Sequence, residues 1–147
     1  MSVDFGCIAW HEDGRWSATT LASTRDIGAI IDALKAQQTN GGAIGLIAIE
    51  DEFVIIARAL GDQMQMMISD ITYALDYEVA AELVEVLDLE FPEEEDESQP
   101  GGDLDLLNDL GVSEMELLTI LDDSELYPDE QLEAIANRLG LVINLIR

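Results

Sequence analysis

The sequence has only one cysteine, one histidine and six lysine or arginine residues among its 147 residues. A single cysteine excludes an internal disulfide, and the apolar neighbours of Cys7 indicate a small buried side chain rather than a reactive thiolate. Nucleic-acid surfaces need clustered lysine and arginine, so six scattered cations argue against direct nucleic-acid binding. We therefore expect a protein of a reducing compartment that does not bind nucleic acid directly.

Long apolar runs are also missing. No stretch of about 18 uninterrupted apolar residues could span a bilayer. The N-terminal residues MSVDFGC do not combine a basic patch with a following apolar run, as a secretory signal would. We expect a cytoplasmic protein that makes no membrane contact.

Negative charge is abundant: the formal net charge is −26, divided as −11 over residues 1–89, −7 over 90–103 and −8 over 104–147. Such a field attracts partners with a basic surface and repels polyanions and anionic membranes. The alternative is that the charge only keeps the protein soluble.

The sequence changes character at the stretch FPEEEDESQPGG, from Phe91 to Gly102, which cannot bury enough apolar surface to fold alone. With 48% hydrophobic residues, the rest of the chain can build a core. We predict an α+β domain at 1–89, an acidic flexible linker at 90–103 and a small helical module at 104–147.

The first domain shows the order ββαβββα, which predicts an antiparallel sheet of about five strands with helices packed on it. Asp-Gly at 13–14 predicts a tight turn between strands 5–10 and 15–21, with His11 as an exposed turn residue. A helix capped by Ser23 or Thr24 should run to Gln38, and a second helix should cover 77–89.

The central hairpin, 43–49 and 53–60, is the most apolar part of the chain, and AIGLIAI indicates a strand buried on both faces. An edge-type third strand is expected around 64–69. Its methionines could form an adaptable binding surface, but core filling is the favoured interpretation. They are Met64, Met66 and Met67.

The sequence pattern of the C-terminal module predicts three short helices. One covers 104–110 and stops at Gly111, a capping box of Ser113 and Glu116 opens the next, and Pro128 begins the last. The tail LVINLIR fits either a helical turn or a strand. So small a module is unstable alone and should dock on the first domain, on a second copy or on a partner. The residues assigned to partner binding are the apolar stripe and the acidic cluster after it: Leu117, Leu118, Leu121, Asp122, Asp123 and Glu125.

No catalytic, metal or cofactor site emerges from the residue pattern. Cys7 and His11 would lie about 13 Å apart on one strand, too far to chelate one ion. The calcium-loop pattern beginning at Asp103 fails because Leu107 falls where a ligand is needed. The zinc deaminase element Pro-Cys-x-x-Cys is missing, so the chain is not itself such a deaminase.

The run DLDLLNDLGVSEMELLTILDDSELYPDEQLEAIANRLG, preceded by an acidic linker and a module that begins with a strand, resembles the actinobacterial family of tRNA adenosine deaminase-associated proteins. The most specific part is Leu107 to Leu118. The resemblance implies association with the deaminase that makes inosine at the tRNA wobble position. It supplies no catalytic residues.

Two hypotheses follow. In the favoured one, the chain is a non-enzymatic acidic partner or regulator of a tRNA adenosine deaminase. In the other, it is a structural protein that self-associates through a sheet edge or its C-terminal helices, and genome position alone links it to the deaminase.

Overall fold

The computed structural model describes residues 4–37 and 39–141, which form one six-stranded antiparallel sheet flanked by helices. The strand order is β2-β1-β3-β4-β5-β6. The strands are β1 (Phe5–Glu12), β2 (Arg15–Thr20), β3 (Ala43–Ile49), β4 (Phe53–Leu60), β5 (Gln63–Ile68) and β6 (Gly101–Gly102). The helices are α1 (Ile27–Gln37), α2 (Glu78–Val86), α3 (Glu114–Leu121) and α4 (Pro128–Leu139), with short 3-10 helices η1 (Ile71–Leu75) and η2 (Asn108–Leu110). The predicted α+β class is confirmed, with one strand more than expected.

Both predicted hairpins are confirmed. β1 pairs with β2 from Cys7 to Glu12, and positive φ angles of 52° at Asp13 and 77° at Gly14 close the turn. The pairing includes His11, which is half-buried and lies 4.9 Å from the Trp16 ring, centroid to centroid. The prediction that His11 is an exposed turn residue was wrong, because a two-residue turn leaves His11 and Glu12 free to pair.

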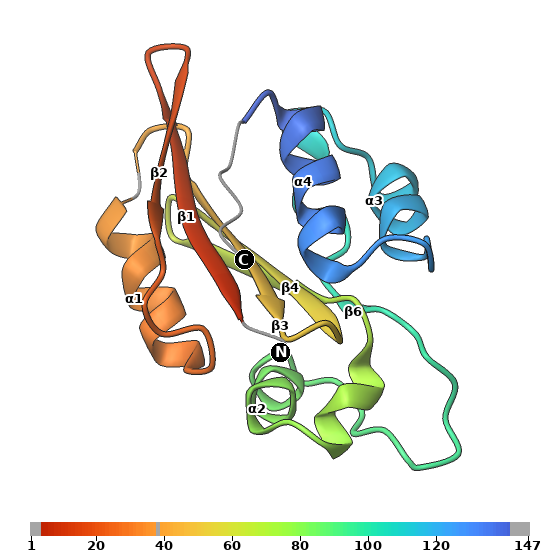
Figure 1. The fold of residues 1–147 in the computed structure, drawn as a ribbon. Coiled ribbons are helices and arrows are strands. Elements are labelled where there is room, and N and C mark those ends of the chain that lie inside the picture. Colours follow the sequence, from red (N-terminus) through yellow and green to blue (C-terminus); the bar gives the residue numbers. More distant parts are fainter. Residues whose placement is uncertain (1–3, 38, 142–147) are drawn as a thin grey trace.

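β3 is the centre of the molecule: all seven of its residues are buried, which confirms the prediction of a strand covered on both faces. Side chains alternate between two cores. Ile47 and Ile55 point into the core shared with α1 and α2, whereas Leu46 and Ile56 point into the core shared with α3 and α4. Figure 1 shows α1 and α4 on opposite sides of the sheet. The sheet is therefore the middle layer between two helical layers.

The first helical layer begins later than predicted. The side chain of Asp26 accepts a hydrogen bond from the Ala29 amide, so α1 starts at Ile27 rather than after Ser23 or Thr24. The Thr24 hydroxyl is not available for capping, because it donates to the Asp4 carboxylate at 2.7 Å. α2 ends at Val86, and the chain then turns through Asp88 with a φ of 55°.

The second layer is the C-terminal helical module, which packs on the other face of the sheet. Leu117 of α3 and Leu132 of α4 are fully buried in this core. The indole of Trp16 donates to the Leu139 carbonyl at 3.0 Å, which links the β1–β2 hairpin to the end of α4. Of the three docking options left open by the sequence, contact with the N-terminal part of the same chain is therefore the arrangement found. The stretch predicted as a helix at 104–110 contains only η2.

Part of the acidic stretch at 90–103 is also built into the sheet. Gly101 and Gly102 pair with Ile68 and Met67 as β6, which is the last strand of the sheet, so β5 has a neighbouring strand on this side only at its C-terminal end. Only glycine fits at 102, because its φ is 99° and a Cβ there would lie 2.4 Å from the Met66 carbonyl oxygen. The flexibility of residues 90–100 and the division into domains stay predictions.

Two further expectations concern side chains and the tail. Cys7 is 5% exposed, and burial raises the pKa of its thiol to about 11, as expected of an inert thiol. Met66 and Met67 are buried and Met64 packs against the core, so core filling is confirmed. The tail from Val142 onward lies outside the described residues.

Candidate partner-binding surface

Three of the six side chains assigned to partner binding line one groove. Leu118 and Leu121 are half-buried on α3, and Asp122 follows as the C-terminal cap. The groove has a volume of about 540 Å³ and lies between α3 and residues 98–100. Its wall also includes Met115, which is 79% exposed. We call it the α3 groove, and its main lining residues are Ser98, Pro100, Met115, Leu118, Leu121 and Asp122.

The remaining three assigned residues do not line this groove. Leu117 is fully buried and holds α3 to the sheet, so it is a core residue. Asp123 and Glu125 are exposed in the turn that leads to α4. The Asp123 carboxylate accepts a hydrogen bond from the Glu125 amide at 3.0 Å, which fixes the turn. The two acidic residues therefore lie beyond the end of α3, next to Asp122.

Local structure fixes α3 at both ends. The Ser113 hydroxyl accepts from the Glu116 amide at 3.2 Å, as the predicted cap requires. The Glu116 carboxylate instead accepts from Arg138 of α4 at 2.6 Å. At the other end, the buried Gln131 amide donates to the Leu121 carbonyl at 3.2 Å. The groove wall is thus held by α4 rather than by α3 alone.

A buried arginine joins the module to the sheet. Arg58 lies in β4, is 3% exposed and forms an ion pair with Asp109, whose Oδ2 accepts from Nη2 at 3.1 Å. Nη1 also donates to the Leu106 carbonyl at 3.0 Å. The Arg58 Nε has no hydrogen-bond partner among the described residues. A buried guanidinium that depends on one carboxylate makes Asp109 the main electrostatic link between the module and the sheet.

The pH dependence of stability should report on this pair. The hydrogen bond from Arg58 lowers the pKa of Asp109, although partial burial opposes the effect. A lowered folded-state pKa means that the pair stabilises the protein above the unfolded pKa of about 3.9 and that this stabilisation is lost as pH falls through the folded pKa. Chemical denaturation at pH about 6, 4 and 3 measures the free energy of unfolding of wild type and of Asp109→Asn. The difference between these two free energies should become smaller as the pH falls. Asp105→Asn is the control, and a difference that does not vary with pH would contradict the assignment.

A second polar cluster lies where β3 turns into β4. Arg25 donates to Asp4 at 2.8 Å and to Glu50 at 2.9 Å, and its guanidinium lies 5.5 Å above the Tyr77 ring. The Tyr77 hydroxyl donates to Glu50 at 3.1 Å. Burial raises the pKa of Tyr77, and the bond to Glu50 raises it further. The arrangement ties the N-terminal segment to the sheet.

Between residues 4 and 141, apart from residue 38, no three His, Cys, Asp or Glu side chains converge in a geometry that could hold a metal ion. None of the helices described is both long and apolar enough to cross a membrane. The residues that sequence analysis missed are Arg58, Asp109 and Met115. Their roles depend on which parts of the chain meet in space.

The fold and its grooves define an acidic α+β protein built on a single antiparallel sheet. Residues 4–142 match the family model described as "Rv3753c-like tRNA adenosine deaminase-associated protein", and the chain belongs to this family. Protein Rv3753c of Mycobacterium tuberculosis is 37% identical to the chain over 146 residues, which cover 96% of this chain and 84% of the relative. No solved structure matches the chain. The resemblance noted in the sequence is confirmed, and the family description names an associated protein rather than a deaminase.

Proposed function

We propose that this chain is a non-enzymatic, cytoplasmic protein that binds a tRNA adenosine deaminase through a basic surface of that enzyme. The family description supports association with such a deaminase. An enzyme that takes tRNA as substrate must present cations to the phosphates. A chain with a net charge of −26 is complementary to that surface and would be steered toward it.

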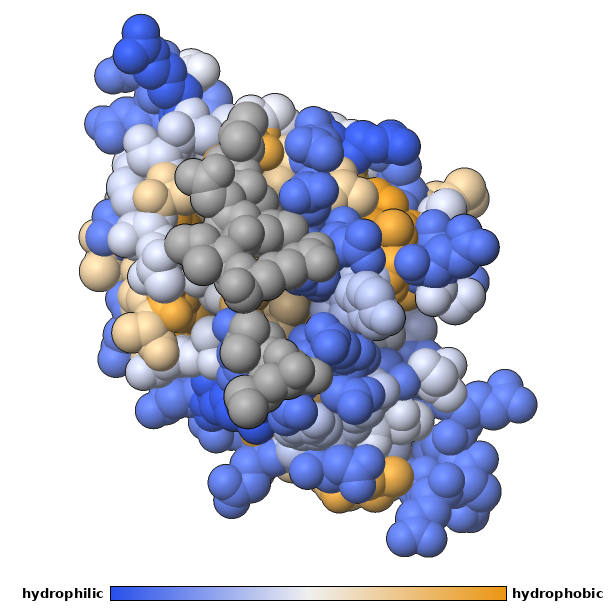
Figure 2. Space-filling view, viewed as in Figure 1, coloured by the Kyte–Doolittle hydropathy of each residue, from blue (hydrophilic) through white to orange (hydrophobic). Residues whose placement is uncertain are grey.

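The observation that carries the proposal is how the chain uses its few cations. Arg25, Arg58 and Arg138 each form an ion pair with a carboxylate. Arg15 lies on the β1–β2 hairpin and Lys35 in the last turn of α1, so neither joins a basic cluster among the described residues. The excess carboxylates of this chain are therefore available to a partner, because no basic patch among the described residues offsets them. Figure 2 shows hydrophilic residues gathered along the right and lower parts of the visible face, with apolar patches between them.

The α3 groove would supply the contact. Met115 and Leu118 offer apolar surface for an anchor side chain, and Asp122 places a carboxylate at the groove's edge. Interfaces of this kind combine an apolar centre, which supplies most of the affinity, with a polar rim. Asp123 and Glu125 extend the acidic rim beyond the groove.

The test uses the purified full-length chain and a purified tRNA adenosine deaminase. Association should be detectable at low salt, should weaken as salt rises because exposed charges are screened over about 8 Å at physiological ionic strength, and should be competed by tRNA. Absence of association at low salt, or binding that neither salt nor tRNA changes, would overturn the proposal.

Self-association is the second candidate. It is favoured by one observation: β2 is an outer strand of the sheet with five of its six residues exposed, so its free edge could pair with another chain. Light scattering after size exclusion distinguishes the two candidates. A stable dimer that does not bind deaminase would favour self-association.

A further inference from the structure

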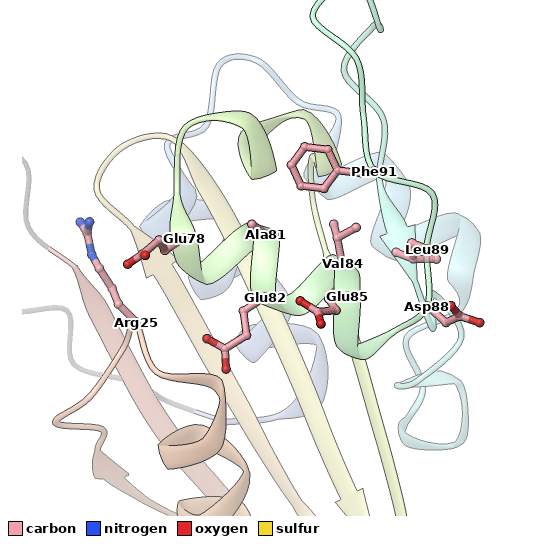
Figure 3. A pocket seen from close by; sticks show the side chains of 9 residues that line it. All are labelled: Arg25, Glu78, Ala81, Glu82, Val84, Glu85, Asp88, Leu89 and Phe91. Carbon is pink, nitrogen blue, oxygen red and sulfur yellow. The ribbon is translucent and has the colours of Figure 1, made fainter.

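The outer face of α2 forms a second groove, which is separate from the α3 groove. Its volume is about 660 Å³. Figure 3 shows Arg25 at one end and Asp88 at the other, with Glu78, Glu82 and Glu85 along the helix between them. Apolar side chains form the rest of the lining. We call this the α2 groove, and those apolar residues are Ala81, Val84, Leu89 and Phe91.

The apolar part of the α2 groove includes an aromatic ring open to solvent. Phe91 is 51% exposed, although it directly precedes the buried Pro92. In Figure 3 its ring stands beside the helix, on the same side as the Val84 and Leu89 side chains. An exposed aromatic ring next to aliphatic side chains is a surface on which the stem and guanidinium of an arginine can pack.

The carboxylates of the groove have no cation of their own. Glu78, Glu82 and Glu85 are spaced at i, i+4 and i+7, so they share one face of α2. All three are exposed, and neither they nor Asp88 form a side-chain hydrogen bond or ion pair with any described residue. Arg25 does not neutralise them, because Asp4 and Glu50 already occupy its guanidinium.

The position of the last two carboxylates strengthens the negative potential. The C-terminal end of a helix carries partial negative charge and favours cations, yet α2 has no basic residue in its last turn. Glu85 lies in that turn, and Asp88 follows with a left-handed φ of 55°. These charges therefore add to the helix dipole instead of compensating for it, at a cost to the stability of α2.

We propose that the α2 groove is the docking site for a basic polypeptide segment of the partner. Arginine and lysine side chains of that segment would pair with the row of carboxylates, and their stems would lie on Ala81 and Leu89 with one guanidinium against Phe91. From Glu78 to Asp88 the row spans about 15 Å at the rise of a helix, which is long enough for several side chains. The proposal rests on the proposed function only in assigning the segment to the deaminase.

The first test measures binding of a fluorescein-labelled octa-arginine peptide to the full-length chain by anisotropy. The variant Glu82→Gln, Glu85→Gln, Asp88→Asn should bind about tenfold more weakly, as expected for the loss of several partly desolvated charge pairs. Asparagine tolerates the left-handed conformation at 88, so the fold should be retained. The control Glu93→Gln, Glu94→Gln, Glu95→Gln changes the net charge equally and should weaken binding less than twofold. Equal weakening by both sets would overturn the proposal.

The second test separates the groove from general charge attraction. Phe91→Ala leaves the net charge unchanged and should weaken peptide binding about threefold, the size of one exposed cation–π contact. Met115→Ala, which removes an exposed apolar side chain from the α3 groove, should leave binding unchanged. Amide chemical-shift changes on adding the peptide should centre on residues 78–91. Changes centred elsewhere, or no effect of Phe91→Ala, would count against the α2 groove.

Deaminase binding then distinguishes this inference from the proposed function. If the deaminase binds the wild type and the α2-groove variant equally well, the docking site is wrong while the proposed function stands. If the peptide maps to the α2 groove but the deaminase does not bind the wild type, the groove is supported and the proposed partner is wrong.

Discussion

Replacing Asp109 by alanine is expected to destabilise the protein by about 2 to 3 kcal/mol, even though the Asp109 side chain is 59% exposed. The cost arises at Arg58, which is 3% exposed and would lose the one carboxylate that it contacts among the described residues. Removing one partner of a fully buried pair costs about 3 to 5 kcal/mol, and we expect less here because water reaches Asp109 and screens the pair. The carbonyls of Leu106 and Gly41 would remain as acceptors.

Replacing the other partner of the pair, Arg58, should cost less stability. Arg58→Met leaves an exposed aspartate, which water solvates, and fills a similar volume with an apolar side chain. Adding Arg58→Met to Asp109→Ala should therefore recover part of the lost stability. Urea denaturation of the two single variants and the double variant gives the coupling free energy. If the free energy of unfolding of Asp109→Ala lies within about 0.5 kcal/mol of the wild-type value, the ion pair does not hold the module to the sheet.

Loss of the Arg58–Asp109 pair should affect mainly the face of the sheet that α3 and α4 cover. Ile44, Leu46 and Ile56 are fully buried beneath the C-terminal module. Weaker docking would expose them, and exposed apolar sheet surface promotes aggregation. An intact Arg58–Asp109 pair is therefore also needed for partner-binding measurements that are free of aggregation.

Local sequence signals predicted the elements whose pattern is short-range. The Asp-Gly turn at 13–14 and the apolar runs on either side of 50–52 gave both hairpins, because the backbone requirements of a tight turn and of a buried strand are local. Ser113 marked the start of α3, and Gly140 adopts the left-handed conformation that ends α4. The predicted start of α1 was too early. Thr24 and Asp26 are both good caps, and the sequence could not show that a distant residue, Asp4, accepts the Thr24 hydroxyl and leaves Asp26 as the cap.

Contacts between distant parts of the chain could not be predicted in this way. β6 consists of two glycines in a stretch whose composition resembles a linker, and only pairing with β5 makes it a strand. Arg58 and Asp109 are 51 residues apart in sequence. The apolar stripe of α3 was predicted, but its periodicity could not show that Leu117 faces the sheet while Leu118 faces a groove. That difference separates a core residue from a candidate binding residue.

Reversing three charges beyond the end of α3 is expected to slow association with the deaminase about tenfold at low salt, because surface charges raise association rates through steering. The variant is Asp122→Lys, Asp123→Lys, Glu125→Lys. Its dissociation rate should change much less, since charges at the rim of an interface act mainly before contact. Surface-based kinetics at several salt concentrations measures both rates, and the association rates of the variant and the wild type should converge as salt rises.

The matched control places the same charge change on three exposed, dispersed residues: Glu12→Lys, Asp32→Lys and Asp62→Lys. Because steering depends on where the charge lies, the control should slow association less than the variant does. Leu118→Asp should act differently from both by raising the dissociation rate, since it puts a charge into the apolar part of the α3 groove, where an anchor side chain would be desolvated. Equal slowing by the variant and the control would mean that only the net charge matters. In that case the α3 groove would lose its place as the contact surface, even if the deaminase still bound.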